Sequence, residues 1–300
     1  MPVDYLSPRY WPTWLALALA RMLTHLPWRW QLAIGRTLGR IMYRLARRRR
    51  HIARINLQLC LPAQTEAERR QLLRKHFEAL GMGALETAMS WWMPDHRLEP
   101  LCRIEGLENL QHALAQGRGV ILLTAHFTTL EIGGRLLAMH APFHVLFREH
   151  KNRLFHAVMR NAREINYEKA IPRGDMRAML RSLRDNHPVW YAPDQNYGRE
   201  HSIFVPFFGV PAATITATAR IAQLSNAPVV PLFQALRSDG RGYLIRLDPA
   251  LRHFPGSDIE AATRRVNGII EDLIRRAPAQ YLWTHRRFKT RPPGESSVYD

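Results

Sequence analysis

Short apolar runs alternate with amphipathic segments along most of the chain, and this alternation restricts the fold more than any other feature. The run GVILLTA at 119–125 lies between a glycine and a polar turn, which is typical of a buried, parallel strand. Similar reasoning predicts strands at 102–105, 143–147, 188–192, 228–233 and 242–247, and helices at 64–91, 108–117, 129–139, 152–164, 175–185, 214–225 and 258–276. The order favours an α/β fold with a mostly parallel sheet flanked by helices.

The N-terminal region has a different composition. An apolar and aromatic stretch at 11–34 is interrupted by Arg21, His25 and Pro27, and it leads into the basic cluster Arg47 to Arg50. The stretch is a marginal transmembrane span, because a full span needs about 20 apolar residues. Basic residues beside an apolar segment favour the cytoplasmic side and anionic headgroups. We therefore predict a membrane anchor with a basic juxtamembrane segment at 1–54, formed by a short span or by interfacial helices, and a second domain at 55–300; a soluble basic helix packed on the body is the alternative.

The chain is strongly basic, with a formal net charge of +18 over 300 residues. Such a charge favours anionic partners, which include nucleic acid, an anionic membrane surface and acidic carrier proteins or substrates. The two cysteines, Cys60 and Cys102, are too few for a disulfide framework and argue against a structural zinc site. The tail after Pro292 is predicted to be flexible.

The segment TAHFTTLEIGG at 124–134 carries the strongest candidate chemistry. His126 stands where a predicted strand ends, and Glu131 follows in the first turn of the next helix. In open α/β sheets, ligands bind beyond the carboxyl ends of the strands. A carboxylate on one imidazole nitrogen leaves the other nitrogen free to accept a proton, so the pair suits general-base catalysis. The alternative is a capping box in which Glu131 returns to the backbone of Thr128.

Other common chemistries lack their motifs. The sequence contains no G-x-S-x-G elbow, no Walker loop, no G-x-G-x-x-G and no H-E-x-x-H. His140, His144 and His150 are loosely spaced across a loop, and we predict no metal site among them.

Several longer motifs resemble the late acyltransferases of lipid A biosynthesis, the lauroyl/myristoyl family that acts on Kdo2-lipid IVA. The resemblance covers nearly the whole chain, and its motifs are WWMPD (91–95), HFTTLE (126–131), FRE (147–149), VWYAPDQNYG (189–198), FVPFFGVPAATITAT (204–218) and QYLWTHRRFKTRP (280–292). It implies a glycerolipid-acyltransferase-like fold with an N-terminal membrane-anchoring helical segment.

The resemblance also implies a reaction. An acyl carrier protein thioester would donate a fatty acyl chain to the hydroxyl of a 3-hydroxyacyl chain on the lipid A precursor, Kdo2-lipid IVA or its acylated product. His126 would be the general base with Glu131 beside it in an HX4E motif, and the reaction would need no metal or other cofactor. The expected location is the inner membrane, with the catalytic domain on the cytoplasmic face. The expected partners are acyl carrier protein, the precursor and anionic lipids, and no nucleic acid.

Three further residues match positions that look functional in this family. Arg148 follows a predicted strand and is a candidate for binding a phosphate or the thioester oxygen, with a surface ion pair as the alternative. Arg163 carries the same alternative. Asp194 follows the strand VWYA and is a candidate for binding a hydroxyl or pairing with an arginine, or it caps a turn.

Two segments could contribute to substrate binding. The apolar run FVPFFGVPAAT could bed an acyl chain or simply pack in the core. The run HRRFKTRP could grip lipid phosphates or the carrier protein, or it could be a solvated basic terminus.

Two rival functions stay open from the sequence. A lysophospholipid or glycerolipid acyltransferase would share the fold and the histidine motif. A basic nucleic-acid or membrane-surface binding protein would explain the charge, but not the histidine and glutamate at the end of a buried strand.

Overall fold

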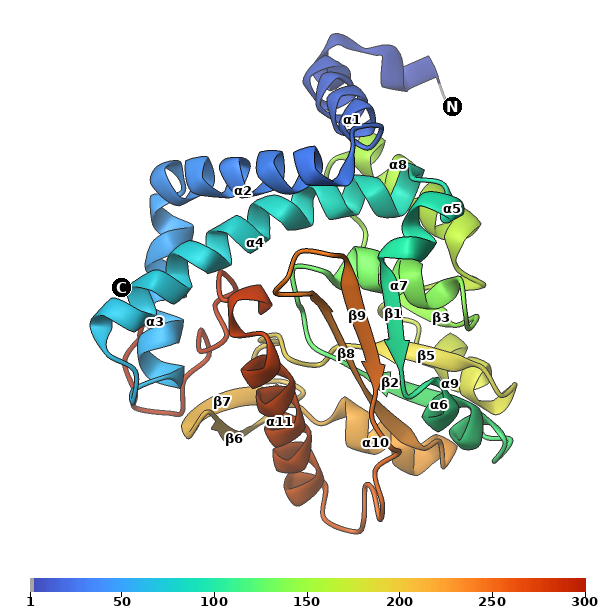
Figure 1. Cartoon of the computed structure of the whole chain (residues 1–300). Helices are drawn as coiled ribbons and strands as arrows, with labels where there is room; N and C mark the ends of the chain where they lie inside the picture. The colour runs from blue at the N-terminus through green and yellow to red at the C-terminus, as the bar shows by residue number, and fades with distance from the viewer. Residues whose placement is uncertain (1–2) are drawn as a thin grey trace.

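A seven-stranded sheet forms the centre of the computed structural model, which describes residues 3–300 (Figure 1). The strand order is β1-β9-β8-β2-β5-β3-β4. All neighbouring strands pair in parallel except β8 and β9, which are antiparallel. The strands are β1 (Cys102–Glu105), β2 (Val120–Leu123), β3 (His144–Phe147), β4 (Lys169–Pro172), β5 (Pro188–Tyr191), β8 (Val229–Leu236) and β9 (Tyr243–Leu247). The predicted α/β fold with a mostly parallel sheet is confirmed.

Helices cover the sheet on both faces, and a separate two-stranded hairpin lies beside it (Figure 1). The helices of the body are α4 (Glu66–Trp92), α5 (Asp95–Leu98), α6 (Leu107–Leu114), α7 (Leu130–Ala138), α8 (Arg153–Asn166), α9 (Met176–Arg184), α10 (Ala217–Ser225) and α11 (Ile259–Arg276). The hairpin pairs β6 (Ser202–Phe207) with β7 (Val210–Ile215). The central strand β2 is buried along its whole length, as expected for a continuous apolar run covered on both faces.

Most elements form where the sequence places them. Helix α4 begins with a capping box at Thr65: the Thr65 hydroxyl accepts from the Glu68 backbone N–H, and the Glu68 carboxylate accepts from the Thr65 N–H. The hairpin was not predicted, so the helix expected over 214–225 starts only at Ala217. Strand β4 was also missed.

The end of the chain differs from the predicted flexible tail. Tyr299 is buried, and its hydroxyl donates to Asn56 Oδ1 over 2.6 Å and accepts from the Phe288 N–H. These bonds attach the last residues to helix α3 (Arg47–Cys60). The tail is therefore packed near its end.

The N-terminal helices differ in how firmly they join the body. Helix α2 (Trp28–Leu45) lies along α4, and at Gly39 and Gly81 a side chain would collide with the backbone of the facing helix. Helix α3 contributes Ile52, Ala53 and Leu57 to the main core. Helix α1 (Trp11–Leu23) projects from the body in Figure 1.

No helix among residues 3–300 is both long and apolar enough to cross a membrane. The division into an anchor at 1–54 and a domain at 55–300 stays a prediction.

Candidate active site

A cavity of about 470 Å³ opens at the carboxyl ends of strands β2, β3 and β5. Four of the predicted site residues line it: His126, Glu131 on α7, Arg148 on the loop after β3, and Arg163 on α8. Most of its wall is apolar or aromatic, from residues that include Leu130, Phe143, Val145, Leu146, Phe147, Met159, Trp190, Tyr191, Ile215 and Ala217. A cavity of this size with an apolar wall and few polar groups is typical of a ligand site.

The imidazole of His126 is bonded to Asp194. Nδ1 of His126 lies 2.6 Å from Asp194 Oδ1, and the backbone N–H of His126 donates to Asp194 Oδ2 over 3.1 Å. The carboxylate therefore holds both the ring and the main chain of the same residue. With the carboxylate accepting from Nδ1–H, Nε2 is the nitrogen that can accept a proton.

Asp194 is ionised in this setting. It is only 2% exposed, and burial alone would raise its pKa, but the charge of His126 and the hydrogen bonds from its ring and backbone lower the pKa below the usual value. The side chain of His126 is 28% exposed. The pair therefore combines a buried carboxylate with a ring that still reaches the cavity.

The loop that carries His126 is fixed by the C-terminal part of the chain. The backbone N–H of Leu282 donates to the His126 carbonyl, and the N–H of Thr128 donates to the Gln280 carbonyl. Phe127 and Tyr281 form an isolated antiparallel bridge between these bonds. The motif that begins at Gln280 thus shapes the site through its backbone.

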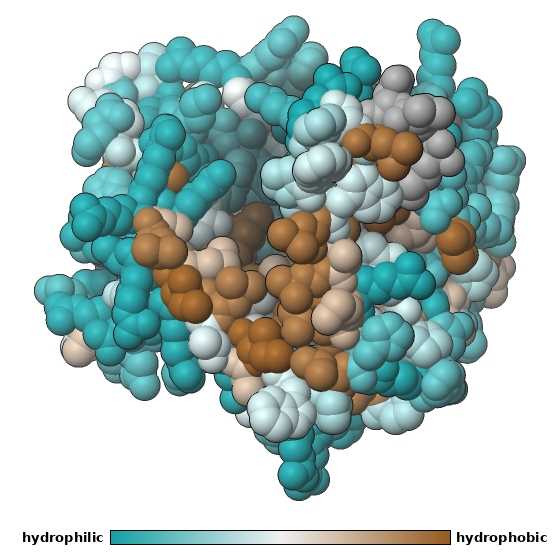
Figure 2. Space-filling model, turned by 90° about the horizontal axis from the view of Figure 1, so that it is seen from above, coloured by the Kyte–Doolittle hydropathy of each residue, from teal (hydrophilic) through white to brown (hydrophobic). Residues whose placement is uncertain are grey.

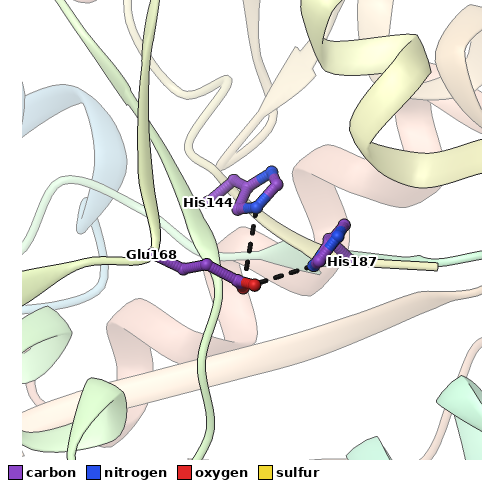
Figure 3. Close-up of side chains that lie close together, drawn as sticks. All are labelled: His144, Glu168 and His187. Atoms are coloured by element: carbon purple, nitrogen blue, oxygen red, sulfur yellow. Dashed lines mark ion pairs between the residues drawn. The ribbon is translucent and has the colours of Figure 1, made fainter. Parts of the chain in front are cut away.

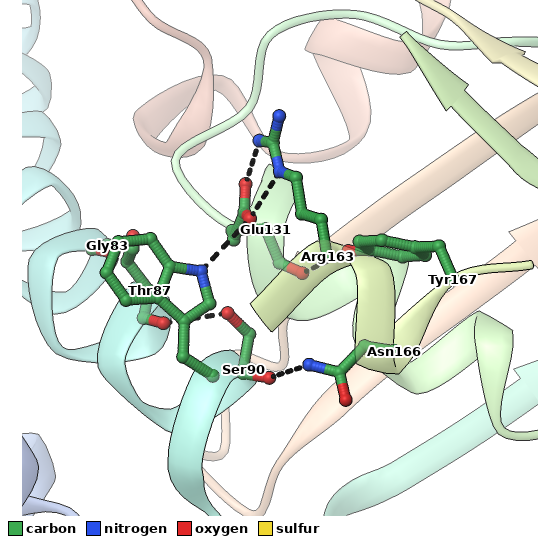
Figure 4. A network of polar contacts seen from close by, with 8 residues as sticks. Gly83, Thr87, Ser90, Glu131, Arg163, Asn166 and Tyr167 are labelled. Atoms are coloured by element: carbon green, nitrogen blue, oxygen red, sulfur yellow. Dashed lines mark hydrogen bonds and ion pairs between the residues drawn. The ribbon is translucent and has the colours of Figure 1, made fainter. Parts of the chain in front are cut away.

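Among the residues that the structure describes, no hydrogen bond joins Glu131 to His126, whose ring is bonded to Asp194, and this corrects the expected His126–Glu131 pair. The Glu131 carboxylate accepts two bonds from Arg163, at 3.0 Å from Nε and 2.6 Å from Nη2 (Figure 4). The indole N–H of Trp91 donates to the same carboxylate. Both charged side chains are largely buried, at 14% and 12% exposure. Glu131 therefore ties α7 to α8 and to the end of α4.

The capping alternative for Glu131 is also wrong. Helix α7 begins at Leu130 with Thr129 before it, and no side chain caps its first turn. The hydroxyl of Thr129 instead donates to the Gln234 carbonyl on β8. Whether Glu131 takes part in turnover stays a prediction.

The two candidate arginines lie in different settings. Arg148 is exposed on the loop after β3 and lines the cavity, and the surface ion pair that was its alternative does not form with any acidic residue among 3–300. Arg163 lines the same cavity, but its guanidinium is paired with the Glu131 carboxylate. Burial would lower the pKa of Arg163, yet the charge of Glu131 and the hydrogen bonds to it raise the pKa above its usual value.

Two apolar or basic segments are largely structural. In the run HRRFKTRP, Arg287 is buried and donates to the Ala213 carbonyl and to Thr214 Oγ1, and Phe288 is fully buried. In the run FVPFFGVPAAT, Phe207 lies in the core, and the first residue to reach the cavity is Ile215, which follows the run at the end of the hairpin. The alternative that this run is a solvated basic terminus is therefore wrong for Arg287.

Asp194 was predicted from the sequence as a site residue, but its bond to His126 was not. The signal was available, since the loops after β2 and β5 follow neighbouring strands and meet at one edge of the sheet. Trp91 and Tyr167 were missed; the Tyr167 hydroxyl lies 3.4 Å from the Glu131 carbonyl. Their roles depend on contacts between distant helices, which no local pattern reveals.

The arrangement can move a proton and exclude water from part of a bound ligand. Among the described residues, no cluster with metal-ligand geometry lies at this cavity; the one such cluster is at the other edge of the sheet. The chemistry best suited to the cavity is proton abstraction from a hydroxyl by His126, oriented by Asp194.

Comparisons with known proteins identify the family. The sequence model of the bacterial lipid A biosynthesis acyltransferase family matches residues 2–290. A lipid A biosynthesis palmitoleoyltransferase of Escherichia coli K12 is 39% identical over 99% of this chain and 97% of its own length. A lauroyltransferase of the same organism is 39% identical over 98% and 96%, and a myristoyltransferase is 30% identical over 99% and 92%. This chain belongs to the bacterial lipid A biosynthesis acyltransferase family.

Proposed function

We propose that the protein transfers a fatty acyl chain from an acyl carrier protein thioester to the hydroxyl of a 3-hydroxyacyl chain on Kdo2-lipid IVA or its acylated product. The observation that carries the proposal is the His126–Asp194 pair, with the ring of His126 at a cavity whose wall is mostly apolar. Acyl transfer in lipid A biosynthesis follows from the family, and the donor, the acceptor and the base are the proposed parts.

The proposed reaction uses His126 as the general base. Nε2 removes the proton of the acceptor hydroxyl while the hydroxyl oxygen attacks the thioester carbonyl. The C–S bond then breaks, and the proton passes from the imidazolium to the departing thiolate. Asp194 holds the productive tautomer through Nδ1 and stabilises the imidazolium. The thioester is already activated, so no covalent enzyme intermediate is needed.

The cavity wall suits one or both acyl chains. Phe143, Phe147 and Trp190 present aromatic surface, and Met159 adds an adaptable side chain. Arg148 lies at the same cavity, and its guanidinium has no ion pair among the described residues, which suits a phosphate of either substrate. The Arg163–Glu131 pair we assign to fixing the wall, since its donors and acceptors are already used.

Basic and apolar surfaces suit an anionic membrane and an acidic carrier protein. A second hollow, of about 320 Å³, is lined by Arg47, Arg50, Arg54, Arg69 and Arg70 from helices α3 and α4. Helix α1 exposes Trp11, Leu15, Leu19 and Met22, which share one helical face. Figure 2 shows hydrophobic residues gathered beside a hollow on the side where α1 and α2 lie. We assign this side to the cytoplasmic surface of the inner membrane, with α1 lying in the interface.

Mass spectrometry of the product lipid tests the proposal. The full-length chain is incubated with acyl carrier protein thioesters and Kdo2-lipid IVA, and the expected product is heavier by one acyl group in ester linkage. The same acyl chain on coenzyme A tests the donor, and a lysophospholipid tests the acceptor of a glycerolipid acyltransferase. Faster acylation of the lysophospholipid would contradict the proposed acceptor.

A further inference from the structure

Three metal-ligating side chains meet at the amino-terminal edge of the sheet, away from the cavity. His144 is the first residue of β3, Glu168 immediately precedes β4, and His187 immediately precedes β5 (Figure 3). These strands are neighbours in the order β5-β3-β4 and run parallel, so their starting points lie side by side. The parallel sheet therefore collects the three residues from distant parts of the sequence.

The donor atoms have the spacing of metal ligands. Oε2 of Glu168 lies 3.2 Å from Nδ1 of His187 and 3.6 Å from Nε2 of His144. Two donors bound tetrahedrally to zinc, with bonds of about 2.0–2.1 Å, are about 3.4 Å apart. One potential ligand atom from each residue lies within 4.8 Å of the others, so small side-chain movements suffice to converge on one ion.

The two histidine rings are stacked on each other, and both face the same carboxylate of Glu168. Their centroids are 4.3 Å apart and the planes are inclined by 22°. Two imidazolium rings stacked in this way would repel each other, so the pair suits neutral rings, which is the form that binds metals.

The surroundings permit access of an ion and do not cancel the ligand charge. His144 is buried, whereas the side chains of Glu168 and His187 are 37% and 34% exposed. Two more charged groups act on His144, and they have opposite signs: Lys169 and Asp185. The local charge that remains is the carboxylate of Glu168.

We propose that His144, Glu168 and His187 bind one divalent transition-metal ion, with Zn²⁺ the best fit to two imidazoles and one carboxylate, and with water in the fourth position. The ion would clamp the starts of three adjacent strands. The carboxyl ends of two of them, β3 and β5, lead into Arg148 and Asp194. The site does not depend on the acyl-transfer proposal, and its test uses no acyl substrate.

Metal titration of the full-length, untagged chain tests the site. After treatment with a chelator and desalting, Zn²⁺ is added at neutral pH and the bound metal is counted, and Co²⁺ is added in parallel for its visible absorption. The expected result is one tightly bound ion per chain. At a hundredfold excess of Zn²⁺ over the dissociation constant, the melting temperature should rise by about 4 °C.

Glu168→Gln and His187→Gln change partly exposed ligands, so they spare the buried His144. Each should weaken Zn²⁺ binding at least about tenfold and abolish the thermal shift. His112→Gln, on the exposed surface of α6, is the matched control and should behave as the unmodified chain does. Failure of the unmodified chain to bind one Zn²⁺, or equal binding by all three variants, would overturn the proposal.

Discussion

The two edges of the parallel sheet combine the same residue types, histidine and a carboxylate, into sites with different chemistry. At the carboxyl edge, a single histidine faces one fully buried aspartate, which holds the ring through Nδ1. At the amino edge, two histidines share one glutamate that is 37% exposed. The first arrangement leaves one nitrogen free beside an apolar cavity, which suits proton transfer. The second leaves three donors converging near solvent, which suits a metal ion. Burial and pairing, and not residue type, separate the two.

Replacing His126 gives the largest expected effect, because it removes the only base proposed at the carboxyl edge. His126→Ala should lower the rate of acyl transfer by about 10²–10⁴-fold. The side chain is 28% exposed and faces the cavity, so the melting temperature should change little. The measurement is initial rate with acyl carrier protein thioester, together with a thermal melt. A variant with near-normal rate would show that the carboxyl edge needs no base.

Asp194→Asn tests whether the carboxylate makes the two edges different. An amide at this position would donate to Nδ1 and place the ring proton on Nε2, which is the wrong tautomer for a base. The rate should fall by about 10²-fold or more. Because the two residues act as a unit, the double variant with His126→Ala should be no slower than His126→Ala alone. Additive losses in the double variant would mean that Asp194 acts independently of the ring.

Much of this architecture followed from the sequence. The alternation of apolar runs with amphipathic segments predicted six of the strands, and the position of His126 after β2 predicted the site. Local spacing failed at Glu131, where proximity in sequence suggested a bond to His126. The ring instead bonds Asp194, which is 68 residues away, because parallel strands bring their ends together.

The missed elements have local physical reasons. Strand β4 is four residues long and ends in Pro172. The β6–β7 hairpin turns at Phe208 and Gly209, both with positive φ, and a glycine between two similar apolar runs was the signal for such a turn. The metal cluster could not be predicted from spacing, since its three residues span strands that only the fold makes adjacent.

Glu131→Gln tests whether Glu131 acts in the chemistry or only in a structural ion pair at the carboxyl edge. It leaves the buried guanidinium of Arg163 without its counter-charge, which is expected to cost about 3 kcal/mol of unfolding free energy. The measurement is denaturant unfolding. Glu131→Gln with Arg163→Met removes both charges and should recover part of the loss. Unchanged stability with a lost rate would instead assign Glu131 to the chemistry.

Glu86 on α4 shows what a buried carboxylate does without a cation, and so sharpens the comparison with Asp194. Its only hydrogen bond among the described residues is from the Tyr243 hydroxyl, at 3.0 Å, and burial raises its pKa to about 8. The neutral form is therefore favoured in the folded chain, and stability present below about pH 4.5 is lost progressively as the pH rises towards 8.

Glu86→Gln removes this titration. Between pH 5 and pH 8 its unfolding free energy should improve relative to the unmodified chain by about 3 kcal/mol. Denaturant unfolding at both pH values measures the difference, and Glu164→Gln, in an exposed pair with Arg160, is the control. If the unfolding free energies of Glu86→Gln and the unmodified chain differ by the same amount at both pH values, Glu86 is already ionised, as Asp194 is.

The smallest expected effect belongs to the amino edge when metal is withheld. With a chelator present, Glu168→Gln should change the unfolding free energy by less than about 1 kcal/mol, because the Glu168 carboxylate is 37% exposed and water screens its pairs with the histidines. Glu164→Gln should behave alike in the chelator but keep the thermal shift on addition of Zn²⁺, whereas Glu168→Gln should lose it. A loss of several kcal/mol in the chelator would make the amino edge a structural ion-pair network like that of Glu131 and Arg163, and the distinction between the two edges would then rest on the His126–Asp194 pair alone.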